Sequence, residues 1–302
     1  MSDPVQYSSE QKIRNVRNGF DPAQRGGHAY VSERPPWPEG GRHYTSYLRL
    51  EEILNCQSPI TDTHDEMLFI MIHQVSELWI KLCLFELESA QRNIMEDRLD
   101  MAFKMIARVS AIQTQLIHSW DVLATMTPPE YAHMRAQSTA SGGSGLQSVQ
   151  YRLLEFLLGN KKPSILAVHE RDPQAKRVLE AALQRPSIYD EALRLLARRG
   201  FAIPEEQLNR DFSQPYTASP AVEEAWKSIY EQYEKYWDLY ELAEKLVDVE
   251  YHVQLWRCHH LKTVERVIGF KRGTGGTSGV PYLASVIDQV FFPELLSVRI
   301  KL

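Results

Sequence analysis

The sequence predicts an all-α fold, a single helical domain with long core helices. Apolar residues recur at three- and four-residue spacing over long stretches that lack Pro and Gly. Residues suited to helix caps stand at the ends of several stretches, and no stretch alternates between apolar and polar residues as a half-buried strand does. Apolar residues make up 43% of the 302-residue chain and charged residues 24%, which is ample core material for a globular domain.

The first long helix is predicted within Asp62–Asp97, where apolar side chains recur without an internal Pro or Gly. A second is predicted over residues 99–125, and the segment TPPE at 127–130 starts a third with the spacing of a capping box. The stretch STASGGSG at 138–145 ends that helix, and the following LQSVQYRLLEFLLG is helical up to Gly159.

The sequence of residues 163–217 predicts short helices between Pro-containing connections. We interpret this segment as a helical excursion from the main domain. One very long helix is predicted from Pro220 to Ile268 with Gly269 as its left-handed cap, and a last helix follows Pro281.

The N-terminal residues 1–42 hold much of the Gly and Pro and show little periodicity. We therefore expect an extended or disordered arm before a domain over residues 43–302. The arm lacks the apolar segment of a secretory signal, and the longest apolar run, residues 67–72, is far shorter than the ~20 residues of a membrane span.

Charge and cysteine content narrow the class of protein. A net charge of −5 disfavours nucleic acid as a partner, because neutralising phosphates requires a basic face. The three cysteines are odd in number and scattered without a CxxC pair, as in a protein whose thiols stay reduced. We expect a cytoplasmic protein that binds neither nucleic acid nor a membrane.

Three histidines on the long C-terminal helix are candidate ligands. His259 and His260 point about 100° apart on a helix, so one should face inward and the other solvent or a partner, while His252 shares a face with His259. A di-iron site is disfavoured because only Glu130–His133 fits Glu-x-x-His, and HExxH is absent. A single inward histidine is typical of a haem proximal ligand, although core histidines are also common on helices.

His73 stands inside the apolar run FIMIHQVSELW, with Phe69 four residues earlier on the same helical face. Considered alone, His73 is better interpreted as a buried histidine satisfied by a backbone carbonyl than as a functional group.

The glycine-rich segment KRGTGGTSG at 271–279 is not a phosphate loop. Its basic pair precedes the glycines, and the GxGxxG spacing fails. It is either a flexible connection or a closing flap that offers the hydroxyl of Thr274 or Thr277 to a small ligand. Tyr131 and Arg135, four apart, either bind one carboxylate together or form a surface stack.

Taken together, the segments HYTSYLRL, HDEMLFIMIHQVSELW, TPPEYAHMR, QSVQYRLLEFLLGNK and LVDVEYHVQLWRCHHLKTVERVIGFKRGTGGTSGV are specific. Through them the chain resembles the bacterial tryptophan 2,3-dioxygenases over nearly its whole length. The resemblance implies an oxidoreductase of the kynurenine route with one haem b per subunit. Such an enzyme inserts both atoms of O₂ across the indole C2–C3 bond of L-tryptophan to give N-formylkynurenine.

The resemblance also implies roles for individual residues. His260 corresponds to the proximal ligand of the haem iron, and His73 to the distal histidine that hydrogen-bonds the indole N–H. Phe69 lines the indole pocket, and Tyr131 and Arg135 bind the substrate carboxylate.

Further residues follow from the same resemblance. Thr274 corresponds to the hydroxyl that contacts the ammonium and carboxylate of the substrate, and Ser144 and Gly145 match a haem-side Ser-Gly pair. The loop before them is about two residues longer than the family pattern, and Leu146 replaces a Phe. A homotetramer is implied, in which the N-terminal segment reaches a neighbouring subunit's pocket through Tyr44, Tyr47 and Leu48.

Two other hypotheses are compatible with the residues alone. The first is a non-catalytic helical protein whose long C-terminal helix binds partners. The second is a haem sensor or transporter that uses both His73 and His260 as axial ligands.

Overall fold

The computed structural model describes residues 43–137, 145–273 and 277–302. Helices joined by loops make up this part of the chain, and it contains no β-strand. The predicted all-α class is therefore confirmed. The predicted N-terminal arm, residues 1–42, lies outside the described residues.

The chain divides into two compact units, Met1–Met71 with Pro129–Thr139, and Ile72–Pro128 with Ala140–Leu302. Within the first unit, the buried carboxylate of Glu66 accepts hydrogen bonds from the backbone N–H groups of Ile60 (2.9 Å) and Thr61 (2.7 Å). These bonds order the turn that leads into the first long helix. The helices that lie in this unit, wholly or in part, are α2 (Tyr44–Tyr47), α3 (Leu50–Leu54), the start of α4 (Asp65–Met95) and α6 (Pro128–Gln137).

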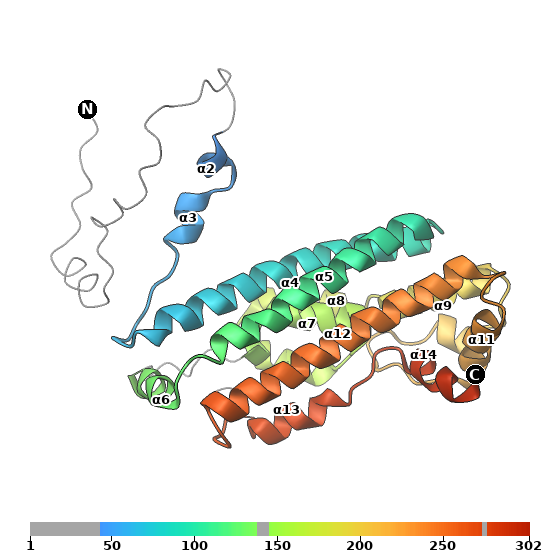
Figure 1. The fold of residues 1–302 in the computed structure, drawn as a ribbon. Coiled ribbons are helices and arrows are strands. Elements are labelled where there is room, and N and C mark those ends of the chain that lie inside the picture. The colour runs from blue at the N-terminus through green and yellow to red at the C-terminus, as the bar shows by residue number, and fades with distance from the viewer. Residues whose placement is uncertain (1–42, 138–144, 274–276) are drawn as a thin grey trace. The chain divides into compact units, whose positions relative to one another are not determined.

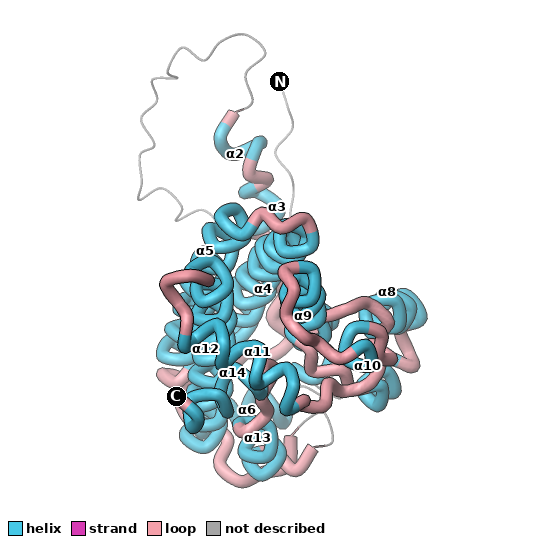
Figure 2. The backbone as a smooth tube through the Cα atoms, turned by 90° about the vertical axis from the view of Figure 1, so that its right-hand side faces the viewer, coloured by secondary structure: helices cyan, strands magenta, loops and turns pink. Residues whose placement is uncertain are grey.

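The core of the second unit is formed by α5 (Leu99–Leu123), α12 (Trp237–Val267) and the part of α4 from Ile72 onward. These helices pack lengthwise, as seen from the side in Figure 1 and nearly end-on in Figure 2. Apolar residues at three- and four-residue spacing give each helix one apolar face. These faces meet in a single cluster that includes Cys83, Leu87, Ile106, Val109, Leu242, Leu246 and Val249.

The predicted single helix from Pro220 to Ile268 is wrong, because the structure has two helices there. The helix α11 (Pro220–Glu231) ends in a turn over residues 232–236 before α12 begins. The turn contains no Gly or Pro, so the sequence carries no local sign of it. Tertiary packing explains it. The side chain of Trp226 on α11 is fully buried in the core, and the ring of Tyr230 packs edge-on against Tyr240 of α12 at 5.4 Å.

Glycines end two helices as predicted. Gly269 follows α12 with a φ of 68°, and its N–H donates to the carbonyl of Val264 at 3.0 Å. Gly159 follows α7 (Val149–Leu158) with a φ of 115°. Both conformations are left-handed ones in which a side chain is strained.

The predicted excursion over 163–217 consists of short helices, and one of them joins the main core. Its α9 begins with a capping box between Ser187 and Asp190, and Leu193 and Leu196 on its apolar face lie in the central cluster. The short helices are η3 (Pro163–His169), α8 (Pro173–Leu183), α9 (Ile188–Arg198) and α10 (Glu205–Leu208).

The C-terminus differs from the single last helix that was predicted. Pro293 starts a second helix after a break, and the buried Glu294 accepts hydrogen bonds from the hydroxyls of Tyr189 (2.9 Å) and Tyr216 (2.6 Å). This buried contact anchors the chain end to the excursion. The elements are α13 (Val280–Ile287), α14 (Pro293–Ser297) and the 3₁₀ helix η4 (Val298–Lys301).

The helix α4 is the one helix of the described residues that is long and apolar enough to cross a membrane, judged by length and composition alone. Core helices of soluble proteins meet the same criteria, so this is weak evidence for a span. In the second unit α4 leaves five large apolar side chains exposed, and four of them are spaced three, four and three residues apart: Val75, Leu78, Leu82 and Phe85.

Candidate functional site

The imidazole of His260 packs against two tryptophans. Trp120 of α5 stacks on it with the ring centroids 4.4 Å apart and the planes 8° from parallel. Trp256, one turn earlier on α12, packs on it at 5.5 Å and 53°. The two indoles also contact each other at 5.4 Å. The lengthwise packing of α5 on α12 therefore determines where this imidazole lies.

This environment keeps His260 neutral. Burial, the larger effect, and the nearby charge of His73 on α4 together lower the pKa of His260 to about 4. At neutral pH the ring therefore carries a lone pair on one nitrogen, which is the form that binds a metal. The residue as a whole remains partly accessible.

The neighbouring histidines are directed elsewhere, in agreement with the expected 100° divergence. His259 lies at the surface, where its Nδ1 is 3.7 Å from Oδ1 of Asp121 and its side chain is 42% exposed. His252 is engaged with its own helix, with Nδ1 2.7 Å from the carbonyl oxygen of Asp248. Of the three, His260 is the one enclosed by aromatic rings.

A cluster of metal-binding side chains is a separate question from a haem site. In the part of the chain that the structure describes, no three His, Cys, Asp or Glu side chains gather in a group that could hold a metal ion. His133 of the one Glu-x-x-His pair is exposed and lies 3.3 Å from Asp62 and 2.9 Å from Gln137. Haem iron takes only one or two ligands from the protein, so this finding does not bear on haem.

His73 is exposed, and the interpretation of it as a buried core histidine is wrong. The apolar run around it misled that interpretation, because α4 does not bury this whole run. Four residues before His73, Phe69 is partly buried.

On α6, Tyr131 and Arg135 are hydrogen-bonded to each other. Burial raises the pKa of Tyr131, and the nearby guanidinium partly offsets this effect. The phenol therefore stays protonated at neutral pH beside a cation, and both can donate hydrogen bonds to an anion. The structure brings this predicted pair together.

The glycine-rich segment closes on itself at its base. The N–H of Gly273 donates to the carbonyl of Thr277 at 3.1 Å. Gly279 has a φ of 74°, and a Cβ atom there would lie 2.4 Å from the carbonyl oxygen of Lys271. Only glycine fits such a close approach of two backbones. The predicted Thr274 lies outside the described residues.

The other predicted site residues are exposed or undescribed. Gly145 begins the 3₁₀ helix η2 (Gly145–Gln147) and is exposed, and Ser144 lies outside the described residues. Tyr44 and Tyr47 of α2 are 64% and 65% exposed, and Leu48 directly after them is also exposed.

Sequence reasoning missed Trp120 and the buried Arg257. The guanidinium of Arg257 lies 3.3 Å from the carboxylate of Glu155 on α7 and donates to the carbonyls of Val286 and Gln289, both at 3.1 Å. It joins α7 and α12 to the end of α13. An Arg one turn before a candidate ligand was a visible signal, whereas nothing in the local sequence of α5 distinguishes Trp120.

Comparisons with known proteins identify the family of the chain. The model of the family described as tryptophan 2,3-dioxygenase matches residues 34–302. The chain belongs to this family. A tryptophan 2,3-dioxygenase of Erythrobacter litoralis (strain HTCC2594) is 59% identical over 85% of this chain and 97% of its own length. Those of Polaromonas sp. (strain JS666) and Bacillus cereus (strain ZK) are 55% and 54% identical over 86% of this chain and 87% and 92% of their own lengths.

Family membership establishes the class of reaction. The chain is an oxidoreductase of the tryptophan 2,3-dioxygenase family, which oxidises tryptophan to N-formylkynurenine. The hypothesis of a non-catalytic interaction protein is thereby set aside.

Proposed function

We propose that the enzyme works with one haem b per subunit and that His260 is the proximal ligand of the haem iron. The observation that carries this proposal is the neutral imidazole of His260, packed against Trp120 and Trp256 in a residue that as a whole is partly accessible. A neutral, orientationally restrained imidazole is what haem iron requires from a proximal histidine. Haem, when bound, supplies the iron at which O₂ is activated.

The residues of the chain then bind and orient L-tryptophan. Arg135 pairs with the substrate carboxylate and the phenol of Tyr131 adds a hydrogen bond, a role supported by the contact between the two side chains. Phe69 contacts the indole, Thr274 contacts the ammonium and carboxylate, and Ser144 and Gly145 line the haem. His73 accepts the hydrogen bond of the indole N–H and so orients the C2–C3 bond.

The haem proposal is tested by the colour of the purified protein. We expect a Soret band that His260→Ala abolishes or greatly weakens, since the ligand to iron is lost. His259→Ala is the matched control, because it removes the adjacent surface histidine and should retain the band. A parent protein that shows no Soret band even with added haemin would contradict the proposal.

Catalysis is tested by anaerobic reduction followed by addition of tryptophan and O₂. N-formylkynurenine absorbance should appear with the parent protein and fall strongly with His73→Ala, which should still hold haem. Loss of haem from His73→Ala, or a six-coordinate low-spin spectrum of the ferrous parent, would instead indicate axial ligation by both His73 and His260.

The role of Arg135 is tested with a pair of substrates. Arg135→Ala should lower kcat/KM for tryptophan by about 100-fold or more, because a charged hydrogen-bonded pair is lost. Tryptamine lacks the carboxylate, so Arg135→Ala should leave the Kd for tryptamine nearly unchanged. An equal loss for both ligands would show that Arg135 acts on something other than the carboxylate.

We also infer a cytoplasmic homotetramer to which the N-terminal segment contributes pocket residues. The exposed rings of Tyr44 and Tyr47 on α2, and the exposed apolar side chains of α4, support contacts with other copies of the chain. Among the described residues, the thiols of Cys56, Cys83 and Cys258 form no disulfide, in keeping with a reducing compartment.

A further inference from the structure

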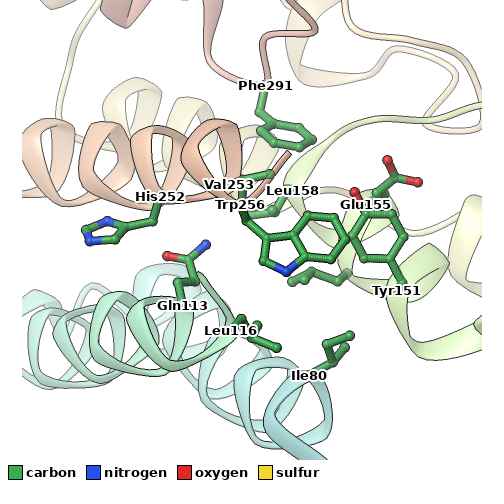
Figure 3. A pocket seen from close by; sticks show the side chains of 11 residues that line it. Ile80, Gln113, Leu116, Tyr151, Glu155, Leu158, His252, Val253, Trp256 and Phe291 are labelled. Atoms are coloured by element: carbon green, nitrogen blue, oxygen red, sulfur yellow. The ribbon is translucent and has the colours of Figure 1, made fainter. Parts of the chain in front are cut away.

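The cavity beside Trp256 is small, and the side chains that line it are mostly apolar (Figure 3). Among the described residues in its wall, none is Arg or Lys, so the cavity offers no cation to an amino-acid carboxylate. In the proposed function that carboxylate is bound by Tyr131 and Arg135 of α6. The contacts that hold α6 in place therefore affect how tightly the substrate binds.

The helix α6 depends on contacts from outside for its position. It has ten residues, of which Met134 is the one that is buried. A helix this short is marginally stable by itself in water, because few of its backbone hydrogen bonds repay the cost of the first turn. Side-chain contacts with neighbouring segments are therefore needed to fix it.

The turn before α4 is an ordered partner for α6. The carboxylate of Glu66 is buried and accepts hydrogen bonds from the backbone and the hydroxyl of Thr61. The same hydroxyl accepts a hydrogen bond from the N–H of Thr63 at 3.3 Å. Asp62 lies between these two buried threonines and is exposed. Its backbone is thus held on both sides while its side chain is free to reach α6.

Two residues of α6 contact Asp62. The amide of Gln137 accepts from the backbone N–H of Asp62 at 3.4 Å through Oε1 and donates to the carboxylate through Nε2. Nε2 of His133 lies 3.3 Å from Oδ1 of the same carboxylate. These contacts lower the pKa of Asp62, and the hydrogen bond from Gln137 is the largest cause.

His133 and Gln137 lie on the opposite face of α6 from the proposed carboxylate binders. Successive residues of a helix are about 100° apart, so His133 is about 200° from Tyr131 and about 160° from Arg135. The contact with Asp62 therefore holds α6 from the side that faces away from the ligand. The turn, the start of α4 and α6 all belong to the first compact unit.

We propose that Asp62 is a positioning residue that, through Gln137 and His133, holds the carboxylate-binding face of α6 at a fixed distance from the start of α4. The proposed ligands of the two ends of L-tryptophan lie on these helices, Arg135 on α6 and Phe69 on α4. A substrate that must reach both is sensitive to their separation. This inference rests on the proposed function of these two residues.

The test is the Kd of the holoenzyme for L-tryptophan, measured by isothermal titration calorimetry. Asp62→Ala should raise this Kd by about 3- to 5-fold, the range expected for the loss of exposed charged contacts. Asp62→Asn should stay close to the parent, because the oxygen of Asn still accepts from Gln137. The matched control is Asp100→Ala, which removes an exposed Asp at the start of α5 and should leave the Kd unchanged.

Two further measurements separate positioning from a general loss of stability. Tryptamine lacks the carboxylate, so Asp62→Ala should leave its Kd unchanged. In the Arg135→Ala protein, adding Asp62→Ala should not weaken tryptophan binding further, since the group that Asp62 positions is gone. Gln137→Ala removes the same contact from the side of α6 and should match Asp62→Ala, which keeps the test open if one variant does not fold.

Parent-like tryptophan affinity in Asp62→Ala, an equal loss in Asp62→Asn, an equal loss for tryptamine, or a full additional loss in the double variant would each overturn the proposal. A failure of the proposed function looks different. In that case the parent does not bind tryptophan, or Arg135→Ala binds it as tightly as the parent, and the positioning role falls with it.

Discussion

At the scale of single residues, the chemistry depends on the surroundings of His260 more than on its being a histidine. Ten histidines occur in the chain, and adjacent His259 and His260 differ completely in environment. The indoles of Trp120 and Trp256 exclude water from the ring of His260, which disfavours its charged form. The same packing restricts the rotation of the ring.

The lowered pKa of His260 predicts an acid-dependent stability in the cofactor-free protein. Between pH 6.5 and about 4 the imidazole of His260 is protonated in the unfolded chain but neutral in the folded protein. The free energy of unfolding should therefore fall as the pH is lowered through this window. The full effect should amount to ~3 kcal/mol. Urea unfolding at pH 7 and at pH 4.5 measures this difference in the free energy of unfolding. In His260→Gln the free energy of unfolding should fall less between the two pH values. An equal loss in both proteins would show that other groups carry the dependence.

Stacking on Trp120 predicts a specific defect in haem retention. Trp120→Leu should release haem about 5-fold faster, because an aromatic pair is worth roughly 1 kcal/mol beyond its buried area, and Trp120→Phe should retain part of the stabilisation. Haem transfer to apomyoglobin measures the rate, and the iron–histidine stretching frequency reports on the ligand itself. Trp237→Leu, at an exposed position of α12, is the control. A Trp120→Leu protein with the parent's rate and frequency would refute this role.

At the scale of elements, the glycine-rich segment between α12 and α13 is a closed structure at its base. Its shape depends on Gly279, where both the backbone conformation and the approach of Lys271 require glycine. The described ends of the segment are therefore held together by backbone contacts. The same ends are compatible with a flap that presents Thr274 to the substrate.

A glycine pair tests this interpretation. Gly279→Ala should destabilise the protein by ~2 kcal/mol or more and raise KM for tryptophan, because both φ and the close backbone contact oppose a Cβ atom. Gly200→Ala has a similar positive φ of 89° but open space around the added atom. It should cost only ~1 kcal/mol and leave KM unchanged. Urea unfolding and steady-state kinetics measure both, and equal effects on KM would argue against the flap.

At the scale of the whole molecule, the exposed stripe of α4 has the three- and four-residue spacing of a helix–helix seam. Exposed apolar side chains that line up in this way usually mark a protein interface. The second unit leaves Leu78 53% exposed and Phe85 62% exposed on this face. Association of subunits through α4 would cover them.

Charge placed in the stripe should therefore disrupt the assembly. Leu78→Glu should convert the proposed tetramer to a smaller species in light scattering coupled to gel filtration, because association would bury an unpaired charge. Lys81→Glu on the same helix changes an exposed residue that is already charged, and it should leave the mass unchanged. An unchanged mass for Leu78→Glu would place the subunit contact elsewhere.

The sequence by itself determined the helical class, most helix boundaries and the family. These follow from local rules: apolar spacing specifies a helix, Gly159 and Gly269 end helices because they tolerate positive φ, and the ordered motifs specify the family. It also selected Tyr131 with Arg135, since residues four apart on a helix must be neighbours.

Only the tertiary structure decided which histidine is enclosed and by what. The family resemblance already favoured His260 over His259, but which rings pack on it depends on where α5 places Trp120, and the break between α11 and α12 rests on the burial of Trp226. The exposure of His73 in an apolar run and the contact of Asp62 with α6 have the same origin. Each of these features depends on contacts between segments far apart in the chain. Local periodicity cannot predict them, because it does not specify which segments pack together.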